Sequence, residues 1–544
     1  MPPDAANGDL IYTMDFKIIT ESGVDNSVAL IKNACEEKSA FVYETCRFSG
    51  GGYAIIDFGE EIGGSVSVVF GKNSGDATIR IRLGESVYEA CAEQGEKNAG
   101  NDHSLRDNFY RVITLGEITS SESGFRFVRI DNVSSQPVEI SRIYVKKYDN
   151  GLKRKGYFAC DDARLNEIYK AAERTISLCV RKNEIWDGVK RDRAMWIGDF
   201  YPELLAAFYV YGVIPQFERV LTECAPNDVC WVNKIPSYSA WWVICLEKYY
   251  ELSGKKAFVK KLLGKVDFVV NAFSSVICEN GEADYTKCKL DYYPCNEFFF
   301  DWPTNLTPDS ENGWRYVVAI ALKKAIKLYS LFKADCSTAQ AVLERLKRYK
   351  YKDSKFKQVT AFGVISGFTD KEKGLKLLGN DEHGMTCFMS FAIAKALGFC
   401  GAGDVALNVL KKYYGAMLDF GATTFWEDFD ISCLKDNPDS LTELPRKDKK
   451  NVHADYGKIC YKGLRGSLCH GWSTGFVDFF YTYVLGVVPT SAGYKTIKIE
   501  PHLCGLSFAE GAFPTKYGLI KIKHSLENGS VKTELELPKG VSLG

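Results

Sequence analysis

The sequence predicts a multidomain protein in which a central all-α (α/α)6 barrel is flanked by an N-terminal β-sandwich and a small C-terminal β-domain. At 544 residues the chain exceeds the size at which a single core stops growing, so two or three domains are expected. The period of the apolar residues changes from strand-like to helix-like near residue 160, and changes back after residue 487. We therefore expect domains at 1–155, 156–487 and 488–544.

Alternating apolar and polar residues predict strands in the first 150 residues. The runs at 65–70 and 79–83 both alternate in this way. Glycine-rich breaks separate such runs, and the glycines at 50–52 lack the strand-to-helix context and the spacing of a phosphate-binding loop. We expect them to form a turn in a sandwich-like domain.

Helical periodicity begins after Asp161 and Asp162, either of which can cap the start of a helix. The apolar residues of that helix fall on one face: Leu165, Ile168, Ala172, Ile176 and Cys179. Further helices are predicted at 204–211, 241–252, 257–273, 316–332, 339–349, 386–397, 405–414 and 476–485. Because the chemically unusual residues lie in the connecting loops, an (α/α) barrel with its site at one end is favoured.

Strand-like alternation returns near the end of the chain, at 496–500, 519–523 and 531–537. Asn528-Gly529 separates the last two runs and is a strong hairpin signal. We therefore expect a small C-terminal β-domain.

Composition excludes several classes of function. The 69 basic and 69 acidic side chains cancel, and the basic residues do not gather with aromatic ones, so nucleic acid binding is not expected. The 18 cysteines include no Cys-x-x-Cys pair, and no His or Cys set has metal-ligand spacing, so neither a metal nor another cofactor is expected. The start of the chain does not resemble a signal peptide, and no run reaches the roughly 18 apolar residues of a membrane span. We expect a cytoplasmic protein with free thiols.

The densest chemistry lies at 186–199, which reads Trp-Asp-Gly-Val-Lys-Arg-Asp-Arg-Ala-Met-Trp-Ile-Gly-Asp between two apolar helix-like runs. A sugar site needs flat apolar faces for the ring, and carboxylates for the hydroxyls and for proton transfer. Two tryptophans among three carboxylates fit that need. The alternative is a surface loop whose arginines and aspartates pair with one another.

Two acidic residues beside tryptophans are candidates for proton transfer: Asp192, four residues before Trp196, and Glu427, directly after Trp426. A glycosidase needs one protonated carboxyl group for the leaving oxygen and one ionised group to activate water or attack carbon. The alternatives are an ion pair between Asp192 and a neighbouring arginine, and a helix-start or solvated role for Glu427.

Other aromatic and histidine residues could bind a sugar, but each also has an ordinary structural explanation. Trp241, Trp242 and Trp302 are candidate sugar platforms, although a tryptophan in a helix or beside a proline more often belongs to the core. His470 stands at the head of an apolar helix, where a lone histidine is more often structural than catalytic.

Eight stretches carry a family resemblance, at 56–63, 81–86, 125–130, 187–199, 301–303, 421–427, 469–472 and 493–501. Their sequences and order resemble the bacterial α-L-rhamnosidases, which are inverting glycoside hydrolases with a six-hairpin (α/α) barrel. The resemblance covers nearly the whole chain.

The acid motif of that family reads Arg-Asp-Glu-Arg-x-x-Trp-x-Gly-Asp, with the Glu as general acid. This chain has Arg-Asp-Arg-Ala-Met-Trp-Ile-Gly-Asp at 191–199. Counting back from Trp196 places Asp192 at the position of the Glu. Counting forward from Asp187 places Arg193 there, which could not donate a proton usefully. The first register keeps the rest of the motif in phase, so we take Asp192 as the acid, with one methylene less reach.

The resemblance implies that Glu427 is the general base. It also implies a single displacement, in which Asp192 protonates the glycosidic oxygen while Glu427 takes a proton from the attacking water. Low-dielectric surroundings and nearby acids would keep Asp192 protonated, whereas Arg191 would oppose this. The predicted substrate-binding residues are Asp187, Arg191, Trp196, Asp199, Trp242, Trp302, Trp426 and His470, of which Trp196, Asp199, Trp302 and His470 match positions that the family uses around the sugar.

The expected function is therefore an inverting exo-glycosidase that releases terminal α-L-rhamnose, or a closely related sugar, without metal or cofactor. One alternative is a catalytically inactive carbohydrate-binding protein on the same fold, which the Asp-for-Glu change keeps open. The other is a six-hairpin hydrolase of another sugar specificity. The expected partners are a small oligosaccharide or glycoside substrate and a second copy in a homodimer, but no nucleic acid and no membrane.

Overall fold

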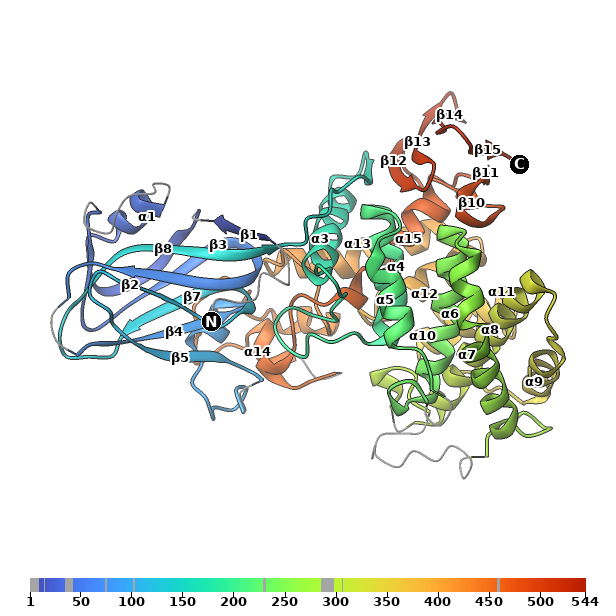
Figure 1. Ribbon diagram of the computed structural model, residues 1–544, viewed down its shortest axis with the longest axis horizontal. Helices are drawn as coiled ribbons and strands as arrows, with labels where there is room; N and C mark the ends of the chain where they lie inside the picture. Colours follow the sequence, from blue (N-terminus) through green and yellow to red (C-terminus); the bar gives the residue numbers. More distant parts are fainter. Residues whose placement is uncertain are drawn as a thin grey trace.

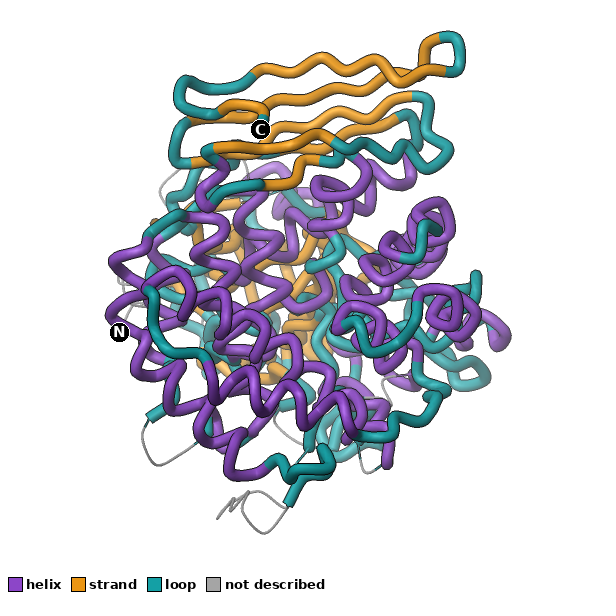
Figure 2. The backbone as a smooth tube through the Cα atoms, turned by 90° about the vertical axis from the view of Figure 1, so that its right-hand side faces the viewer, coloured by secondary structure: helices purple, strands orange, loops and turns teal. Residues whose placement is uncertain are grey.

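The structure is a computed structural model that describes residues 9–13, 15–34, 43–73, 76–100, 103–227, 231–284, 298–305, 307–456 and 460–544. A β-sheet region occupies one end of the molecule, and the helices follow it along the long axis (Figure 1). The last strands lie across one end of the helices (Figure 2). The fold thus combines helices and sheets, with a small sheet region at the C-terminus.

An eight-stranded sheet forms the N-terminal region, in the order β1-β8-β3-β7-β4-β5, with β2 and β6 also paired to β3. The predicted strand runs at 65–70 and 79–83 lie in β3 and β4. Strand β3 pairs antiparallel with β2, β6 and β7 and also pairs with β8, and the sheet has its own apolar core. The elements are β1 (Asp9–Thr13), β2 (Lys17–Asp25), α1 (Val28–Ala34), β3 (Cys46–Phe70), β4 (Thr78–Gly84), α2 (Val87–Cys91), β5 (Arg106–Arg111), β6 (Glu117–Thr119), β7 (Ser123–Asn132) and β8 (Val138–Asp149).

The prediction of a turn at 50–52 is wrong, because these glycines lie inside β3. Gly51 has a φ of 77°, and the register with β2 shifts between Ser22 and Val24. A Cβ on Gly52 would lie 2.5 Å from the carbonyl oxygen of Gly23. The glycines therefore form an irregularity within paired strands, where close backbone approach and not chain reversal requires them.

Helix α3 (Ala163–Cys179) begins the helical region as predicted. The side chain of Asp162 accepts the N–H groups of Arg164 and Leu165 at 2.9 and 3.2 Å. Asp161 instead accepts the N–H of Ser507 at 2.9 Å. All five residues of the predicted apolar face are buried.

A series of helices packs side by side in the centre of the molecule. Helices α4, α6, α8, α10 and α12 each contact the next, and the short α15 contacts both α12 and α4, which closes the series. Nearly every residue of α4 and α6 is buried, as expected for helices surrounded by other helices. The bounds are α4 (Ile197–Tyr211), α5 (Pro215–Glu223), α6 (Pro236–Ser253), α7 (Lys256–Val276), α8 (Pro308–Phe332), α9 (Ser337–Arg348), α10 (Lys357–Ser366), α11 (Lys371–Leu378), α12 (Ser390–Phe399), α13 (Gly403–Asp419), α14 (Val452–Tyr456) and α15 (Val477–Phe479).

Within the described part of the chain, no helix is both long and apolar enough to span a membrane. Four helices of the helical region lie outside every range predicted from the sequence: α5, α10, α11 and α14.

Two small sheets form the C-terminal region, and one of them includes a strand that precedes the helices in the chain. Strand β9 (Tyr157–Cys160) joins a four-stranded sheet of order β14-β13-β12-β9. Asn528 and Gly529 reverse the chain with φ values of 50° and 77°, as the hairpin signal predicts. The other strands are β10 (Val487–Pro489), β11 (Thr496–Ile499), β12 (Phe508–Thr515), β13 (Gly518–Glu527), β14 (Ser530–Glu536) and β15 (Ser542–Leu543).

Candidate active site

A cavity of about 170 Å³ lies among the loops that connect the helices. This space holds on the order of ten water molecules, which is the scale of one sugar ring. Predicted site residues make up half of its lining: Asp187, Asp192, Trp196, Asp199, Trp302, Glu427 and His470. The remaining lining residues are Lys234, Ile235, Tyr238, Phe299, Asn305, Tyr461 and Trp472.

The loop before α4 brings Asp187 and Asp192 to this cavity. Asp187 closes the loop, because its N–H donates to the carbonyl of Ala194 at 3.1 Å and its Oδ1 accepts the N–H of Ala194 at 3.0 Å. Asp192 and Arg193 have φ values of 58° and 52°, in the left-handed region. Such a conformation costs about 1–3 kcal/mol per residue and persists only where the surroundings fix it. The loop is therefore held by its contacts and not by its own preference.

One guanidinium joins the predicted acid to the predicted base. Nη2 of Arg191 donates to both carboxylate oxygens of Glu427, at 2.7 and 2.5 Å, and Nη1 donates to Asp192. The guanidinium also lies over the ring of Tyr461, 4.2 Å from its centroid. The side chain of Asp192 is 30% exposed, whereas that of Glu427 is 3% exposed. Asp192 thus forms the ion pair that was the alternative to its role as the acid, but it still reaches solvent. Glu427 is buried and is not a solvated surface acid.

Glu427 is fixed from several sides. Its N–H donates to the carbonyl of Ser467 at 2.9 Å, and the N–H of Ser467 returns a hydrogen bond to Oε2 at 3.0 Å. Nε1 of Trp472 donates to the Glu427 carbonyl at 3.1 Å. Nε2 of His470 lies 3.8 Å from Oε1. The base candidate therefore has a single, well-defined orientation.

Burial controls protonation around the cavity. It raises the pKa of Asp187 to about 7 and, together with the charge of Asp187, raises the pKa of Asp199 well above its ordinary value. Burial, and then the charge of Arg191, lowers the pKa of His470 well below its usual range. The imidazole of His470 is therefore neutral near neutral pH, and it lies 3.8 Å from Asp199. Asp187 and Asp199 keep their protons to a higher pH than a free aspartic acid does.

Aromatic rings form the apolar part of the cavity wall. Trp196 meets Tyr238 edge-on with ring centroids 6.3 Å apart, and Trp302 lies 5.4 Å from Phe299 and 5.5 Å from Tyr461. Rigid flat faces next to a few polar groups are what a sugar ring needs. Sequence reasoning missed most of these rings, because Tyr238, Phe299 and Tyr461 stand outside every quoted stretch; Trp472 stands inside one.

Two predicted sugar contacts lie in the core instead. Trp242 is fully buried and its Nε1 donates to the carbonyl of Leu221 at 2.9 Å. Trp426 is 2% exposed and packs edge-on against Phe429, 5.3 Å between centroids. Neither lines the cavity, which corrects the expectation for both. Arg191 does not line it either, but acts on it through Glu427.

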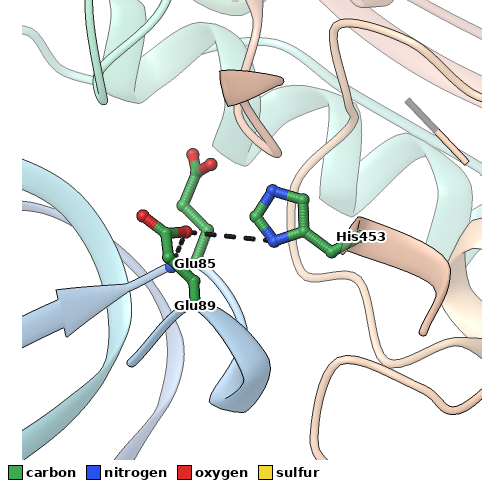
Figure 3. Close-up of side chains that lie close together, drawn as sticks. All are labelled: Glu85, Glu89 and His453. Atoms are coloured by element: carbon green, nitrogen blue, oxygen red, sulfur yellow. Dashed lines mark hydrogen bonds and ion pairs between the residues drawn. The ribbon is translucent and has the colours of Figure 1, made fainter. Parts of the chain in front are cut away.

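The described residues contain one group with the spacing of metal ligands: Glu85, Glu89 and His453, whose ligand atoms lie within 4.8 Å of one another (Figure 3). The ammonium of Lys190 supplies a positive charge to this group, 3.0 Å from Glu89 Oε1 and 3.6 Å from Glu85 Oε2. His453 is also occupied, since its Nδ1 is hydrogen-bonded to Ser86 Oγ at 2.9 Å. An internal ion pair accounts for the cluster.

Comparison with known sequences points to one group of proteins. Residues 486–543 match the family described as the bacterial alpha-L-rhamnosidase C-terminal domain. An alpha-L-rhamnosidase of Formosa agariphila is 21% identical over 540 residues, which is 89% of this chain and 54% of that protein. The chain spans only about half the length, or less, of the curated relatives that it matches.

Solved structures share the fold. A GH78 family rhamnosidase of Bacillus sp. GL1 superposes with a TM-score of 0.68 at 22% identity, covering 92% of this chain and 53% of that one. A rhamnosidase from Klebsiella oxytoca, determined with rhamnose bound, gives a TM-score of 0.68 at 20% identity and covers 88% of this chain and 96% of that one. This chain is thus similar to the bacterial alpha-L-rhamnosidases in the sequence of its C-terminal region, in its curated relatives and in its fold.

Proposed function

We propose that the protein is an inverting glycoside hydrolase that releases terminal α-L-rhamnose, or a closely related sugar, from a glycoside. The observation that carries this proposal is that Asp192 and Glu427 line one aromatic, sugar-sized cavity. Relatives named as rhamnosidases, one of them with rhamnose bound, support the choice of sugar.

In this mechanism Asp192 is the general acid. It is the more exposed of the two carboxyl groups, so it can meet the leaving-group oxygen at the solvent side of the cavity. Glu427, oriented by Ser467 and Arg191, is the base that takes a proton from water on the opposite face of the sugar. Asp187, Asp199 and the neutral His470 are proposed to bind hydroxyl groups.

A second candidate function is sugar binding without turnover. Arg191 occupies both oxygens of Glu427, and a carboxylate held by a cation is a weaker base. The shorter side chain of Asp192 at the acid position also favours binding without turnover. Under this alternative, rhamnose binds in the cavity and no glycoside is cleaved.

The test is p-nitrophenol release from an aryl α-L-rhamnoside by the wild type, Asp192→Asn and Glu427→Gln. We expect each variant to lose about 10²–10⁴-fold in kcat, because each removes a proton-transfer group. The exposed Glu223→Gln serves as a control and should keep wild-type activity. Equal activity in all four proteins would refute the mechanism, and calorimetric rhamnose binding with no turnover would favour the second candidate.

The stereochemistry and the sugar require their own measurements. Proton NMR of the fresh product should show the anomer opposite to that of the substrate, as a single displacement by water predicts. A panel of aryl glycosides would reveal another specificity as faster release from a different sugar.

The proposal extends to the architecture and setting of the chain. We propose that the closed series of helices is an (α/α)6 barrel of six hairpins, that the N-terminal sheet folds as a β-sandwich, and that the domains divide at 1–155, 156–487 and 488–544. The free thiols of the 14 described cysteines support a reducing, cytoplasmic location. A homodimer would appear in light scattering as twice the chain mass of 60.9 kDa.

A further inference from the structure

Two of the family-like stretches, 56–63 and 81–86, lie in the N-terminal sheet region and line no part of the cavity. They contribute Glu61 and Glu85 to a buried group of carboxylates that also includes Glu89 from α2, all at most 2% exposed. Burial raises the pKa of Glu61 well above its ordinary value and that of Glu85 to about 7. So many buried acids are costly, and they persist only where they have strong partners.

The partner of this acidic group on the helical side is Lys190, which is fully buried. Its ammonium lies 3.0 Å from Glu89 and 3.6 Å from Glu85, and it also donates to the carbonyl of Leu464 at 2.6 Å. The carbonyl of Lys190 accepts Nη2 of Arg106, another residue of the N-terminal sheet, at 2.6 Å. The N-terminal region therefore holds both the main chain and the side chain of Lys190.

Lys190 immediately precedes Arg191 and the candidate acid Asp192 in the chain. Asp192 has the left-handed backbone that only its surroundings can maintain. Contacts that hold Lys190 in place therefore also restrict the position of the Asp192 backbone.

Glu85 also holds the base side. Its Oε1 accepts the hydroxyl of Ser467 at 3.0 Å and its Oε2 accepts the N–H of Leu468 at 2.8 Å. Ser467 is the residue whose N–H and carbonyl both bind Glu427. The carboxylate of Glu85 therefore reaches each proton-transfer candidate through one intermediate residue. Lys190 is that residue on the side of Asp192, and Ser467 is that residue on the side of Glu427.

We propose that Glu85, with Glu89 and Lys190, is a positioning unit through which the N-terminal region sets the separation of Asp192 and Glu427. None of the three touches the cavity, so they act through the residues that do. The inference rests on the proposed function for its kinetic readout, but the geometry it predicts can be measured without catalysis.

The main test variant is Glu85→Gln in the full chain. Glutamine keeps the shape, but it presents an N–H₂ group to one of the two donors, Ser467 Oγ or Leu468 N–H, and removes the charge facing Lys190. We expect kcat to fall about 100-fold, as for a displacement of roughly 1 Å at a reacting group, with KM nearly unchanged. Ser467→Ala removes one hydrogen bond to Glu85 and is the milder second variant if Glu85→Gln does not fold.

The matched control is Asp57→Asn. Asp57 is equally buried, ion-pairs with Arg126 at 2.7 Å within the same sheet, and Arg126 reaches the helical region at the carbonyl of Gly421. It contacts neither the acid loop nor Ser467. We expect this variant to lose stability but to keep the kcat of the wild type.

Amide hydrogen exchange separates this inference from the proposed function. In Glu85→Gln and Ser467→Ala, exchange should accelerate at 187–193 and 466–470 and not elsewhere, whether or not the wild type hydrolyses rhamnosides. Exchange and kcat equal to the wild type in both variants would overturn the inference. An equal kcat loss in Asp57→Asn would also overturn it, because it would show that general destabilisation is sufficient. An inactive wild type would refute only the proposed function.

Discussion

At the scale of single residues, burial decides the charge of the site more than sequence spacing does. Asp187, Asp192 and Asp199 are equivalent carboxyl groups in the sequence. In the structure burial raises the pKa of Asp187 to about 7, and burial together with the charge of Asp187 raises the pKa of Asp199 well above its ordinary value, whereas Asp192 reaches solvent. The division of roles among similar residues is therefore a property of their surroundings.

Asp187→Asn should flatten the pH dependence of stability. The native carboxyl keeps its proton up to about pH 7, while the unfolded chain loses it near 3.8. Between these values the native state binds more protons, so the free energy of unfolding falls as pH rises, by up to about 1.4 kcal/mol per pH unit. Asparagine keeps the oxygen that accepts the Ala194 N–H and never ionises.

The measurement is urea unfolding at several pH values between about 4 and 8. Wild type and the exposed control Glu223→Gln should lose stability across this window, and Asp187→Asn should lose less. Parallel curves for all three proteins would contradict a buried, protonated Asp187.

At the scale of elements, close helix contacts shape the cavity wall. Gly198 lies in the first turn of α4, where a Cβ would approach Cε1 of Tyr238 to 2.7 Å. Tyr238 is on α6 and lines the cavity. The small residue therefore lets two buried helices meet and sets where an aromatic ring faces the cavity.

Gly198→Ala should displace the Tyr238 ring and raise KM for an aryl rhamnoside about tenfold, which equals about 1.4 kcal/mol of binding free energy. Gly264→Ala in α7 is the matched control, since its Cβ meets nothing within 4 Å. Alanine there should stabilise the helix by up to about 1 kcal/mol and leave KM unchanged. An unchanged KM in Gly198→Ala would show that Tyr238 does not contact the sugar.

Sequence periodicity found most helices of the central region but missed α5, α10, α11 and α14. Helix α10 reads Lys-Gln-Val-Thr-Ala-Phe-Gly-Val-Ile-Ser, with β-branched residues and a glycine, and it is helical because α8 and α12 pack against it. The same reasoning failed at 50–52, where glycines serve a contact with β2 that local sequence does not encode.

At the scale of the whole molecule, aromatic contacts tie the C-terminal strands to the helices. The ring of Phe513 on β12 meets Tyr209 of α4 and Tyr481 edge-on, with centroids 5.7 and 5.6 Å away, and Tyr209 stacks on Tyr481 at 4.1 Å. Strand β9, from before the helices, completes the same sheet. The C-terminal sheet is thus joined to the helices through both chain connectivity and packing.

Phe513→Ala should therefore destabilise the helices together with the sheet, by about 3–5 kcal/mol. Circular dichroism during heating should show one transition at a lower temperature, at both helix and aromatic wavelengths. Phe109→Ala, at a side chain 61% exposed, is the control and should change stability by about 0.5 kcal/mol or less. A separate early transition in Phe513→Ala would mean that the C-terminal sheet unfolds independently.

The sequence alone determined the order of sheet, helices and sheet, the cap and apolar face of α3 and the Asn528-Gly529 hairpin, because these depend on local periodicity and on turn residues. Its motifs, and the family resemblance that they carry, pointed to seven residues of the cavity lining. Tertiary structure decided the rest. Only packing could show that Trp242 and Trp426 belong to the core, that Tyr238, Phe299 and Tyr461 face the cavity, and that Arg191 binds Asp192 and Glu427 together. The physical reason is that burial, pKa and ion pairing depend on neighbours that are distant in the sequence, and a chain read in order does not reveal which of them meet.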